Sequence, residues 1–451
     1  MRFIGLLPVM RRDTTGALTV GETSKRTSRR RFLHQCAYGG AASILAACTV
    51  PAPSAPAVEP TIAELDALLL TPTTDRLPLT PTAAPRAAPT AVPRLPGPPT
   101  PGPDSFAACG GRQALIERAQ AEGELTVMAL PHDWLNYGAI IDSFRRQYGI
   151  TVNELDPEAS SDEVLAGIKL AAMSREAIAP DVIDVSFAYG QQAQDSTLLQ
   201  PYTIERWAEI PDALKDKRGY WTSGYAGVVS FAVNKAAVAQ TPLGWADLTK
   251  TVYAGQFAFT GDPHSANQTI QSIYAATFAN GGSLDDAGPG LAFIANLRDA
   301  GTLNTVMATP ALFLRGDTPI IPVWSYIAHA LRIQAGSNPL VEVVVPKSSI
   351  AGAYVHAINA YAPHPYAARL WMEHLFSDDV QMLWANAYAI PARAAKLIAE
   401  PSRSAIFAAL GVTAELLADI QIPSLNQLTA AKARITEQWD SVVAVDIKAI
   451  E

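Results

Sequence analysis

The feature that most constrains the fold of this 451-residue chain is an alternation of strand and helix patterns that begins near residue 125. Residues 125–130 are an apolar run of strand length, and residues 150–155 and 181–186 predict further strands. Between these strands, residues 137–148 carry apolar side chains at helical spacing. A second helix is predicted to begin at the capping residue Ser160. Short alternating units of this kind predict an α/β fold with an open, mostly parallel sheet.

The alternation resumes after a polar and aromatic segment at residues 215–221. Further strands are predicted at residues 227–234, 256–260, 319–324, 341–345 and 354–361. Further helices are predicted at residues 267–280, 285–300, 325–334 and 365–376, with more helices from there to the end. The chain is therefore long enough, and has enough α/β units, for two or more domains.

Composition excludes several classes of function. The formal net charge is −8, so no face needs to be basic enough to attract phosphate backbones, and nucleic acid is not expected as a partner. Only three cysteines are present, which leaves neither a disulfide framework nor a cysteine metal site. We expect no cofactor, no metal and a monomeric protein.

The stretch from Ser28 to Cys48 predicts an export signal. Consecutive arginines stand before Phe32 and Leu33, and a weakly apolar run ends in small residues before Cys48. This pattern is typical of a twin-arginine signal peptide that ends in a lipobox. The run 36–47 is shorter than the roughly 20 residues that a membrane-spanning helix needs. We therefore expect residues 1–47 to be removed and Cys48 to carry lipid, which places the protein outside the cytoplasm. The alternative is an ordinary basic N-terminal helix.

Residues 48–105 predict a proline-rich linker. Fifteen of the 34 prolines of the chain lie between Thr49 and Asp104, mixed with threonine and alanine. Such a segment has too little apolar surface to offset the entropy of ordering, so we expect a disordered, partly extended tether.

The predicted strand ends mark candidate binding loops. In open α/β sheets, ligands bind outside the carboxyl ends of the strands. In the first part of the fold this rule selects residues 131–136, 159–161 and 187–190, all of which we expect to be loops.

Short motifs along the chain give a resemblance to a known family. They are Ala-Pro-Asp-Val-Ile-Asp-Val at 179–185, Leu-Leu-Gln-Pro-Tyr at 198–202, Tyr225 and Gly227 before Val-Asn-Lys at 233–235, Trp-Ala-Asp-Leu at 245–248, Tyr-Ala-Gly at 253–255, Gly-Asp-Pro at 261–263, Ala-Asn-Gly-Gly-Ser at 279–283, Ala-Pro-His-Pro-Tyr-Ala-Ala at 362–368 and Ile-Pro-Ala-Arg at 390–393. In order and spacing, the region 115–393 resembles the extracellular solute-binding proteins of ABC importers. The similarity is to the branch with polyamine, ferric-iron, thiamine and aminophosphonate receptors.

The resemblance implies a type II-like, two-lobe periplasmic-binding-protein fold. It places the first lobe at 106–230, the second at 231–345, and the return to the first lobe with C-terminal helices at 346–451. Strands would cross between the lobes near 226–234 and again after about residue 345. Such proteins are not enzymes, and their partners are a small solute and the permease and ATPase subunits of an importer.

The strand-end rule and the resemblance together give candidate ligand-binding residues. In the first lobe these are His132, Asp133, Trp134, Ser160, Ser161 and Tyr189, and in the second Asp262, His264, Ser265, Trp324, Ser325 and Tyr326. Tyr225, at the predicted hinge, completes the set. Each has a structural alternative: Asp133 and Ser160 as helix caps, Trp324 and Tyr326 as core residues, and the histidines as loop residues with local partners.

The chemistry of the solute stays open between three classes. Relatives that bind ferric iron have adjacent tyrosines at the corner occupied here by Trp324, Ser325 and Tyr326, which puts iron in doubt. Aromatic walls with Asp133 or Asp262 favour an amine. Ser160, Ser161, Ser265 and helix N-termini suit a phosphonate-like anion. We favour an organic amine, including a zwitterion.

Two other classes of function stay open for this sequence. A secreted hydrolase that uses His132 and Asp133 is the enzymatic alternative, although the sequence has no G-x-S-x-G elbow and no paired-histidine zinc motif. A solute sensor or adhesion module without a transporter is the other alternative.

Overall fold

The computed structural model describes residues 102–174, 179–279, 281–336 and 340–449. The predicted signal peptide, the lipidation site Cys48 and almost all of the predicted linker lie outside these residues. All the described residues belong to one unit of the chain by their contacts. None of the helices in this part is both long enough and apolar enough to span a bilayer.

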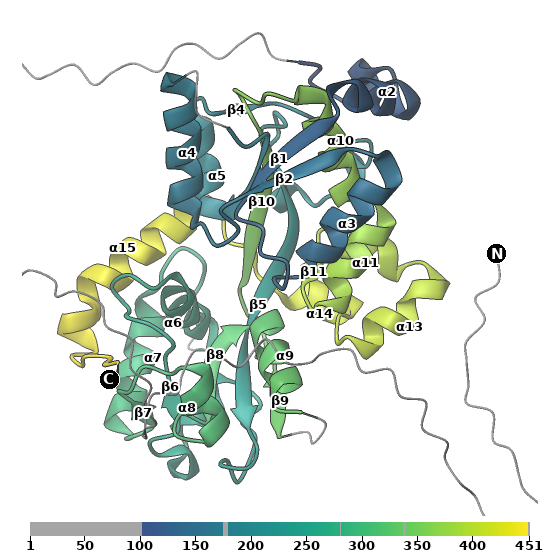
Figure 1. Ribbon diagram of the computed structural model, residues 1–451. Coiled ribbons are helices and arrows are strands. Elements are labelled where there is room, and N and C mark those ends of the chain that lie inside the picture. Colours follow the sequence, from purple (N-terminus) through teal and green to yellow (C-terminus); the bar gives the residue numbers. More distant parts are fainter. Residues whose placement is uncertain (1–101, 175–178, 280, 337–339, 450–451) are drawn as a thin grey trace, which may run out of the picture. The chain divides into compact units, whose positions relative to one another are not determined.

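The elements follow the predicted alternation of strands and helices (Figure 1). The strands are β1 Glu124–Met128, β2 Thr151–Leu155, β3 Val182–Ser186, β4 Leu199–Gln200, β5 Thr222–Asn234, β6 Phe257–Ala258, β7 Leu303–Asn304, β8 Ile320–Trp324, β9 Val341–Val344, β10 Ala351–Asn359 and β11 Ile390–Pro391. The α-helices are α2 Arg112–Glu122, α3 Tyr137–Tyr148, α4 Ser161–Met173, α5 Phe187–Asp195, α6 Asn267–Ala279, α7 Gly288–Asp299, α8 Pro310–Arg315, α9 Ser325–Gln334, α10 Pro365–Leu375, α11 Asp378–Asn386, α12 Ala394–Ile398, α13 Pro401–Ala409, α14 Ala414–Asp419 and α15 Leu425–Val442.

Strand β5 connects two groups of strands. Its first half pairs antiparallel with β10 and with β11. Strand β10 also pairs antiparallel with β3. Its second half pairs antiparallel with β8 and β9. Every residue of β5 is buried, as expected of a strand covered on both faces. We call the region of β1 to β4, β10 and β11 the first lobe and that of β6 to β9 the second lobe; Figure 1 shows β5 running through both.

Strands β1 and β2 form a separate parallel pair in the first lobe. Asp181, just before β3, is fully buried and ties this pair to β3. Its Oδ2 accepts a hydrogen bond from the Thr126 N–H at 2.7 Å, and its own N–H donates to the Thr126 carbonyl at 2.7 Å. The carboxyl ends of β1, β2 and β3 are thereby held next to one another.

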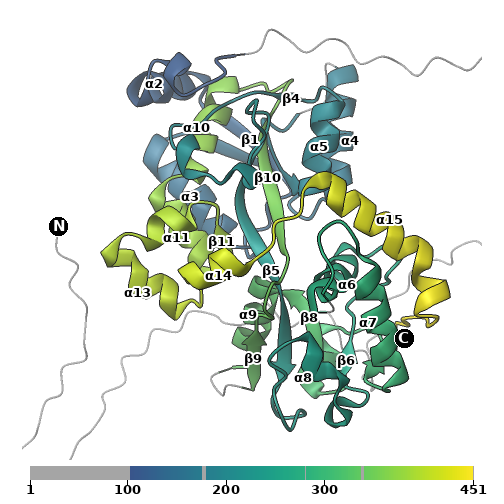
Figure 2. The same ribbon diagram turned by 180° about the vertical axis from the view of Figure 1, so that it is seen from behind.

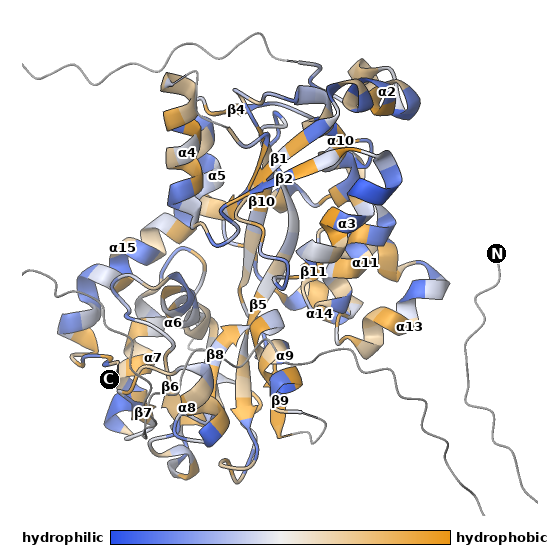
Figure 3. Cartoon of the chain, in the orientation of Figure 1, coloured by the Kyte–Doolittle hydropathy of each residue, from blue (hydrophilic) through white to orange (hydrophobic). Residues whose placement is uncertain are grey.

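Helix α3 illustrates how the pattern of apolar residues predicted the packing. The predicted range 137–148 is the observed range, and Ile140, Ile141, Phe144 and Tyr148 are all buried. Figure 3 shows the apolar and polar residues of this helix on different sides of it. The observed helix is therefore an amphipathic one with its apolar stripe in the core.

Three predicted details differ from the structure. Residues 187–190 are the first turn of α5 rather than a loop, because Phe187 packs on Trp221 at 5.0 Å between ring centroids. Strand β5 begins at Thr222, five residues before the predicted start, because its small and polar residues there still pair with β10. Helix α8 was not predicted; it is six residues long.

Helix α15 packs on the second lobe and also touches α5 of the first lobe, and Figure 2 shows it from behind. It contacts α6 and α7, and its Trp439 is buried and lies 6.1 Å from the ring of Phe259. An ion pair of 3.4 Å joins Arg434 to Asp286. Helix α15 is the last of the C-terminal helices expected in 346–451.

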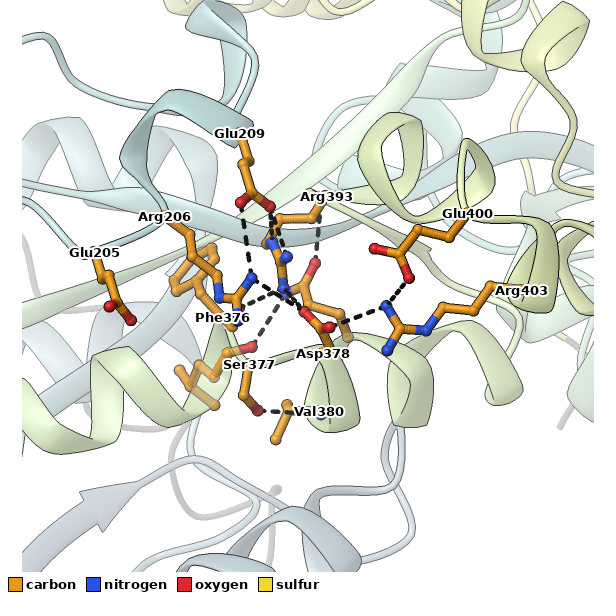
Figure 4. A network of polar contacts seen from close by, with 12 residues as sticks. Glu205, Arg206, Glu209, Phe376, Ser377, Asp378, Val380, Arg393, Glu400 and Arg403 are labelled. Atoms are coloured by element: carbon orange, nitrogen blue, oxygen red, sulfur yellow. Dashed lines mark hydrogen bonds and ion pairs between the residues drawn. The ribbon is translucent and has the colours of Figure 1, made fainter. Parts of the chain in front are cut away.

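A buried arginine anchors β11 beside β5 (Figure 4). Arg393 is fully buried and pairs with Glu209 at 2.6 Å and with Asp378 at 2.7 Å. Asp378 is also 3.0 Å from Arg403. Because each charge has an opposite charge and hydrogen bonds, the network fixes the chain after β11 on the first lobe.

Candidate functional site

The candidate site is a cavity of about 410 Å³ at the carboxyl ends of the first-lobe strands. It is lined by the residues after β1 and β2, the start of α4, the end of β3, α5, β5 and β10. Asn267 at the start of α6 is the second-lobe residue in this lining. The described lining residues include the carboxylates of Glu158, Asp162 and Asp184, and no lysine, arginine or histidine.

Rows of side chains across the strands form the floor of the cavity. Tyr354 on β10 pairs with Ser186 on one side and with Tyr225 on the other. Asp184 lies two residues before Ser186, opposite His356. Residues two apart in a strand face the same side, so β3 presents Asp184 and Ser186 together to the cavity.

Asp184 is held in place through one of its two carboxylate oxygens. The Tyr137 hydroxyl donates to Oδ2, and His356 Nε2 lies 3.4 Å from the same oxygen. The N–H of Gly224 donates to His356 Nδ1 at 3.1 Å, so the network assigns the ring proton to Nε2, where it faces Tyr137 and Asp184.

The second oxygen of Asp184 is buried and unpaired beside the cavity. The residue is 9% exposed, and Oδ1 has no hydrogen-bond partner in the described part of the chain. A buried carboxylate oxygen without a partner is costly, since its desolvation is not compensated. A cationic hydrogen-bond donor in the cavity would remove that cost.

Aromatic rings form the walls beside Asp184. The rings of Tyr225 and Tyr354 are stacked, with 5.5 Å between centroids and 15° between planes. The indole N–H of Trp134 donates to the Tyr225 hydroxyl at 3.4 Å. Burial and the nearby Asp184 charge raise the pKa of Tyr354 to about 12 and that of Tyr225 well above its usual value. Both phenols are therefore neutral near pH 7.

The serines at the start of α4 line the cavity and also cap the helix. Ser160 and Glu163 form a capping box, in which the Ser160 N–H donates to the Glu163 carboxylate at 2.7 Å. Ser161 Oγ accepts from the Ser186 N–H at 3.1 Å. Because Asp162 and Glu163 already lie in the first turn, two negative charges oppose the binding of an anion there.

The first-lobe candidates are largely brought together. Trp134, Ser160, Ser161, Tyr189 and Tyr225 all line the cavity. Asp133 is exposed and is not in the lining, and neighbouring His132 pairs with Glu154 at 2.5 Å.

The second-lobe candidates are placed elsewhere. Trp324 and Tyr326 are buried, and Tyr326 packs edge-on against Trp134 at 5.2 Å behind the lining. Ser325 lines a different cavity. Ser265 is exposed, while Asp262 and His264 form a cluster with Asp440 of α15 at 2.8 and 3.1 Å.

Sequence reasoning missed Asp184, Tyr354 and Asn267. The signal for Asp184 was present, since an acid in the predicted strand 181–186 needs a partner or a function. Tyr354 was predicted only as the start of a strand. Among the described residues, no group of three or more histidine, cysteine, aspartate or glutamate side chains could hold a metal ion.

Solved structures with the same fold are two-lobed binding proteins. AfuA from Actinobacillus pleuropneumoniae, a periplasmic binding protein with exogenous fructose-6-phosphate bound, matches 72% of this chain and 99% of its own, with a TM-score of 0.53 and 16% identity. Iron-bound HitA from Pseudomonas aeruginosa matches 70% of this chain and 99% of its own, with a TM-score of 0.53 and 16% identity. The spermidine/putrescine ABC transporter substrate-binding protein PotD from Streptococcus pneumoniae matches 71% of this chain and 99% of its own, with a TM-score of 0.54 and 14% identity.

The fold and the cavity thus define a two-lobe solute-binding protein. A family model described as bacterial extracellular solute-binding protein matches residues 178–407, just over half of the chain. The chain belongs to this family, which implies a location outside the cytoplasm. A comparison with curated proteins gave no significant match.

Proposed function

We propose that this protein is the lipid-anchored substrate-binding component of an ABC importer and that it captures an organic cation, including a zwitterion with an ammonium group. The observation that carries the solute class is the lining of the cavity, which contains the carboxylates of Glu158, Asp162 and Asp184 and, among its described residues, no basic side chain. An ammonium group would supply the opposite charge and a hydrogen-bond donor for a lining carboxylate.

The aromatic walls support the same ligand class. Trp134 and Tyr354 line the cavity beside Asp184, and aromatic π faces attract cations, by about 2 kcal/mol where water is excluded. A phosphate or phosphonate group would instead meet the carboxylates of Glu158, Asp162 and Asp184 at short range.

Ferric iron is not favoured. Iron-binding sites need deprotonated phenolates, and the raised pKa values of Tyr225 and Tyr354 make that ionisation costly beside the Asp184 carboxylate. Iron, as bound by HitA, is therefore not expected here, and the carboxylates of the lining disfavour a sugar phosphate such as the fructose-6-phosphate bound by AfuA.

The remaining parts of the proposal concern the cell. Residues 1–47 would be removed on export, Cys48 would carry the lipid, and residues 48–105 would tether the binding domain to the membrane. The partners would be the solute, a permease and an ATPase, with the protein acting as a monomer. A lipid label that persists in a Cys48→Ser variant would contradict the anchor.

The direct test is a thermal-shift panel on the full chain in detergent. The cations are spermidine, putrescine, choline and thiamine, the zwitterion is 2-aminoethylphosphonate, and the anionic comparators are inorganic phosphate and ferric citrate. A specific ligand at about 100 times its Kd stabilises by about 2.7 kcal/mol. We expect a shift from at least one ammonium compound and none from phosphate or ferric citrate. A shift from the anionic comparators alone would overturn the proposed solute class.

A further inference from the structure

A second cavity lies on the opposite face of β5 from the candidate solute site. We call it the hinge cavity and define it by Val228, Ser325, His329, Arg332, Tyr388 and Val412; its volume is about 310 Å³. Tyr225 lines the first cavity and Val228 the second, because side chains an odd number of positions apart point to opposite faces of a strand. The hinge cavity is therefore a separate site, within the size range of pockets for small ligands.

Arg332 gives the hinge cavity a positive charge without a carboxylate partner. Its guanidinium lies 5.6 Å from the centroid of the Tyr388 ring and donates to the Tyr388 hydroxyl at 3.4 Å. No aspartate or glutamate lies among the described lining residues, and no described carboxylate lies within 4.0 Å of Arg332. Glu342, on the adjacent β9, is held instead by Lys235 at 3.3 Å and by the Thr241 hydroxyl at 2.7 Å.

His329 adds an unpaired polar atom. Its ring stacks on Tyr388, with 3.8 Å between centroids and 7° between planes. Its Nδ1 is buried and has no hydrogen-bond partner among the residues that the structure describes. Burial and the charge of Arg332 lower the pKa of His329 to about 4, so the ring is neutral near pH 7 and can donate from Nδ1 as one of its tautomers.

The rest of the lining is apolar. Val343, Ile390 and Leu416 belong to it together with Val228 and Val412. Ser325 is already engaged, since its Oγ accepts from the Val228 N–H at 3.3 Å and donates to the Tyr388 carbonyl at 3.5 Å. The hinge cavity thus combines one cation, a lining histidine whose buried Nδ1 is unpaired, and an apolar wall.

We propose that the hinge cavity binds a small amphipathic carboxylate, with the carboxylate paired to Arg332 and His329 and the short apolar chain against the valine, isoleucine and leucine side chains. Arginine suits a carboxylate because its planar donors match the two oxygens. The apolar wall favours such a molecule over inorganic phosphate, which would leave the wall without contact.

The test uses hexanoate as the probe, with isothermal titration of the full chain in detergent. We expect hexanoate to bind, while hexylamine and hexanol at the same concentrations do not. Arg332→Gln should weaken hexanoate binding at least tenfold. Arg146→Gln, on an exposed position of α3, is the matched control and should leave it unchanged. Equal binding by wild type and Arg332→Gln, or binding of hexanol as strong as that of hexanoate, would overturn the proposal, as would binding of inorganic phosphate in preference to hexanoate.

Two further measurements keep the result interpretable. His329→Phe retains an aromatic ring to stack on Tyr388 and removes Nδ1, so it should weaken hexanoate binding even if Arg332→Gln folds poorly. In ¹⁵N-labelled protein, hexanoate should shift the ring nitrogens of one histidine of the seven, and that signal should be absent in His329→Phe. An unaltered affinity in His329→Phe, or a histidine shift that persists in this variant, would place the ligand elsewhere.

Discussion

The two lobes contribute unequally to the candidate solute site. The first lobe and β5 supply a buried carboxylate, four aromatic side chains and the start of α4, whereas the described second-lobe lining is Asn267. At the corresponding strand ends of the second lobe, Trp324 and Tyr326 are core residues and His264 is held by Asp262 and Asp440. The same chain geometry therefore produces a binding surface in one lobe and packing in the other.

The difference shows that strand-end position is not sufficient to make a binding residue. A side chain at a strand end faces a ligand only when no other element covers it. In the second lobe, α15 meets the loop before α6 through the His264 to Asp440 contact of 3.1 Å. In the first lobe, the ends of β1, β2 and β3 remain open to a cavity. We infer that solute affinity resides mostly in the first lobe, with the second lobe completing the site on closure.

The largest expected effect on solute affinity comes from a substitution of Asp184, and it tests whether the first lobe contributes most of that affinity. Asp184→Asn keeps an acceptor for Tyr137 but removes the charge, so binding of the organic cation identified in the panel should fall on the order of 100-fold. Isothermal titration calorimetry measures this loss of affinity. Asp162→Asn, at the exposed start of α4, is the control and should cost less than about fivefold, because an exposed charge is screened. Equal losses in the two variants would show that Asp184 is not the anchor.

The next effect concerns stability in the first lobe. Glu373 on α10 is buried, and burial raises its pKa to about 7, although it accepts from the Tyr202 hydroxyl at 2.7 Å. Between its unfolded pKa of 4.5 and about 7, the folded protein holds a proton that the unfolded chain has released. Stability should therefore fall by roughly 2–3 kcal/mol as the pH rises through this window.

Denaturant unfolding of wild type and Glu373→Gln from about pH 4 to about pH 8 measures that fall. The variant cannot lose the proton, so its stability should change less across the window and should exceed that of wild type at the upper end. Parallel pH curves for the two proteins would contradict the assignment.

A pair of tryptophans compares the lobes directly. Trp134→Leu removes part of the aromatic wall and should weaken binding of the organic cation about tenfold. Trp324→Phe, in the second lobe, should leave the affinity within about twofold but lower the free energy of unfolding by about 1–3 kcal/mol, because Trp324 is a core side chain. The same titration and unfolding experiments measure both. Reversed outcomes would mean that the second lobe holds the solute.

The smallest effect is local and belongs to the second lobe. Hydrogen bonding to Asp262 raises the pKa of His264, and Asp440 adds to the shift. The folded pKa exceeds the unfolded value of 6.5, so this contribution is complete below pH 6.5 and is lost as the pH rises through the folded pKa. The protection factors of α15 amides, from which the intrinsic pH dependence of exchange is divided out, should then fall modestly above about neutral pH, and His264→Gln should remove this fall. Protection factors that fall equally in the variant would exclude His264 as the cause.

Much of the fold could be predicted from sequence because periodicity is local. The range 137–148 and the strand starting at residue 182 follow from apolar spacing alone. The site could be predicted only in part. The role of Asp184 depends on the pairing of β3 with β10, which places it opposite His356, and pairing between strands far apart in sequence leaves no local signal. The position of α15 is equally non-local, since an amphipathic helix can cover either lobe.

Helix α15 also changes how the two lobes can move. The segment before α15 runs past the hinge. There the Gln421 N–H donates to the Ser349 carbonyl at 2.8 Å, and the Gln421 carbonyl accepts from the Ala351 N–H at 2.8 Å. Together with β5 and the segment that joins β9 to β10, this is a third covalent connection between the lobes. Two connections allow the second lobe both to bend and to twist relative to the first. The third connection leads into α15, which packs along α6 and α7 and touches α5, so it should resist the twist. We therefore expect the angle between the two lobes to vary over a narrower range than two connections would allow.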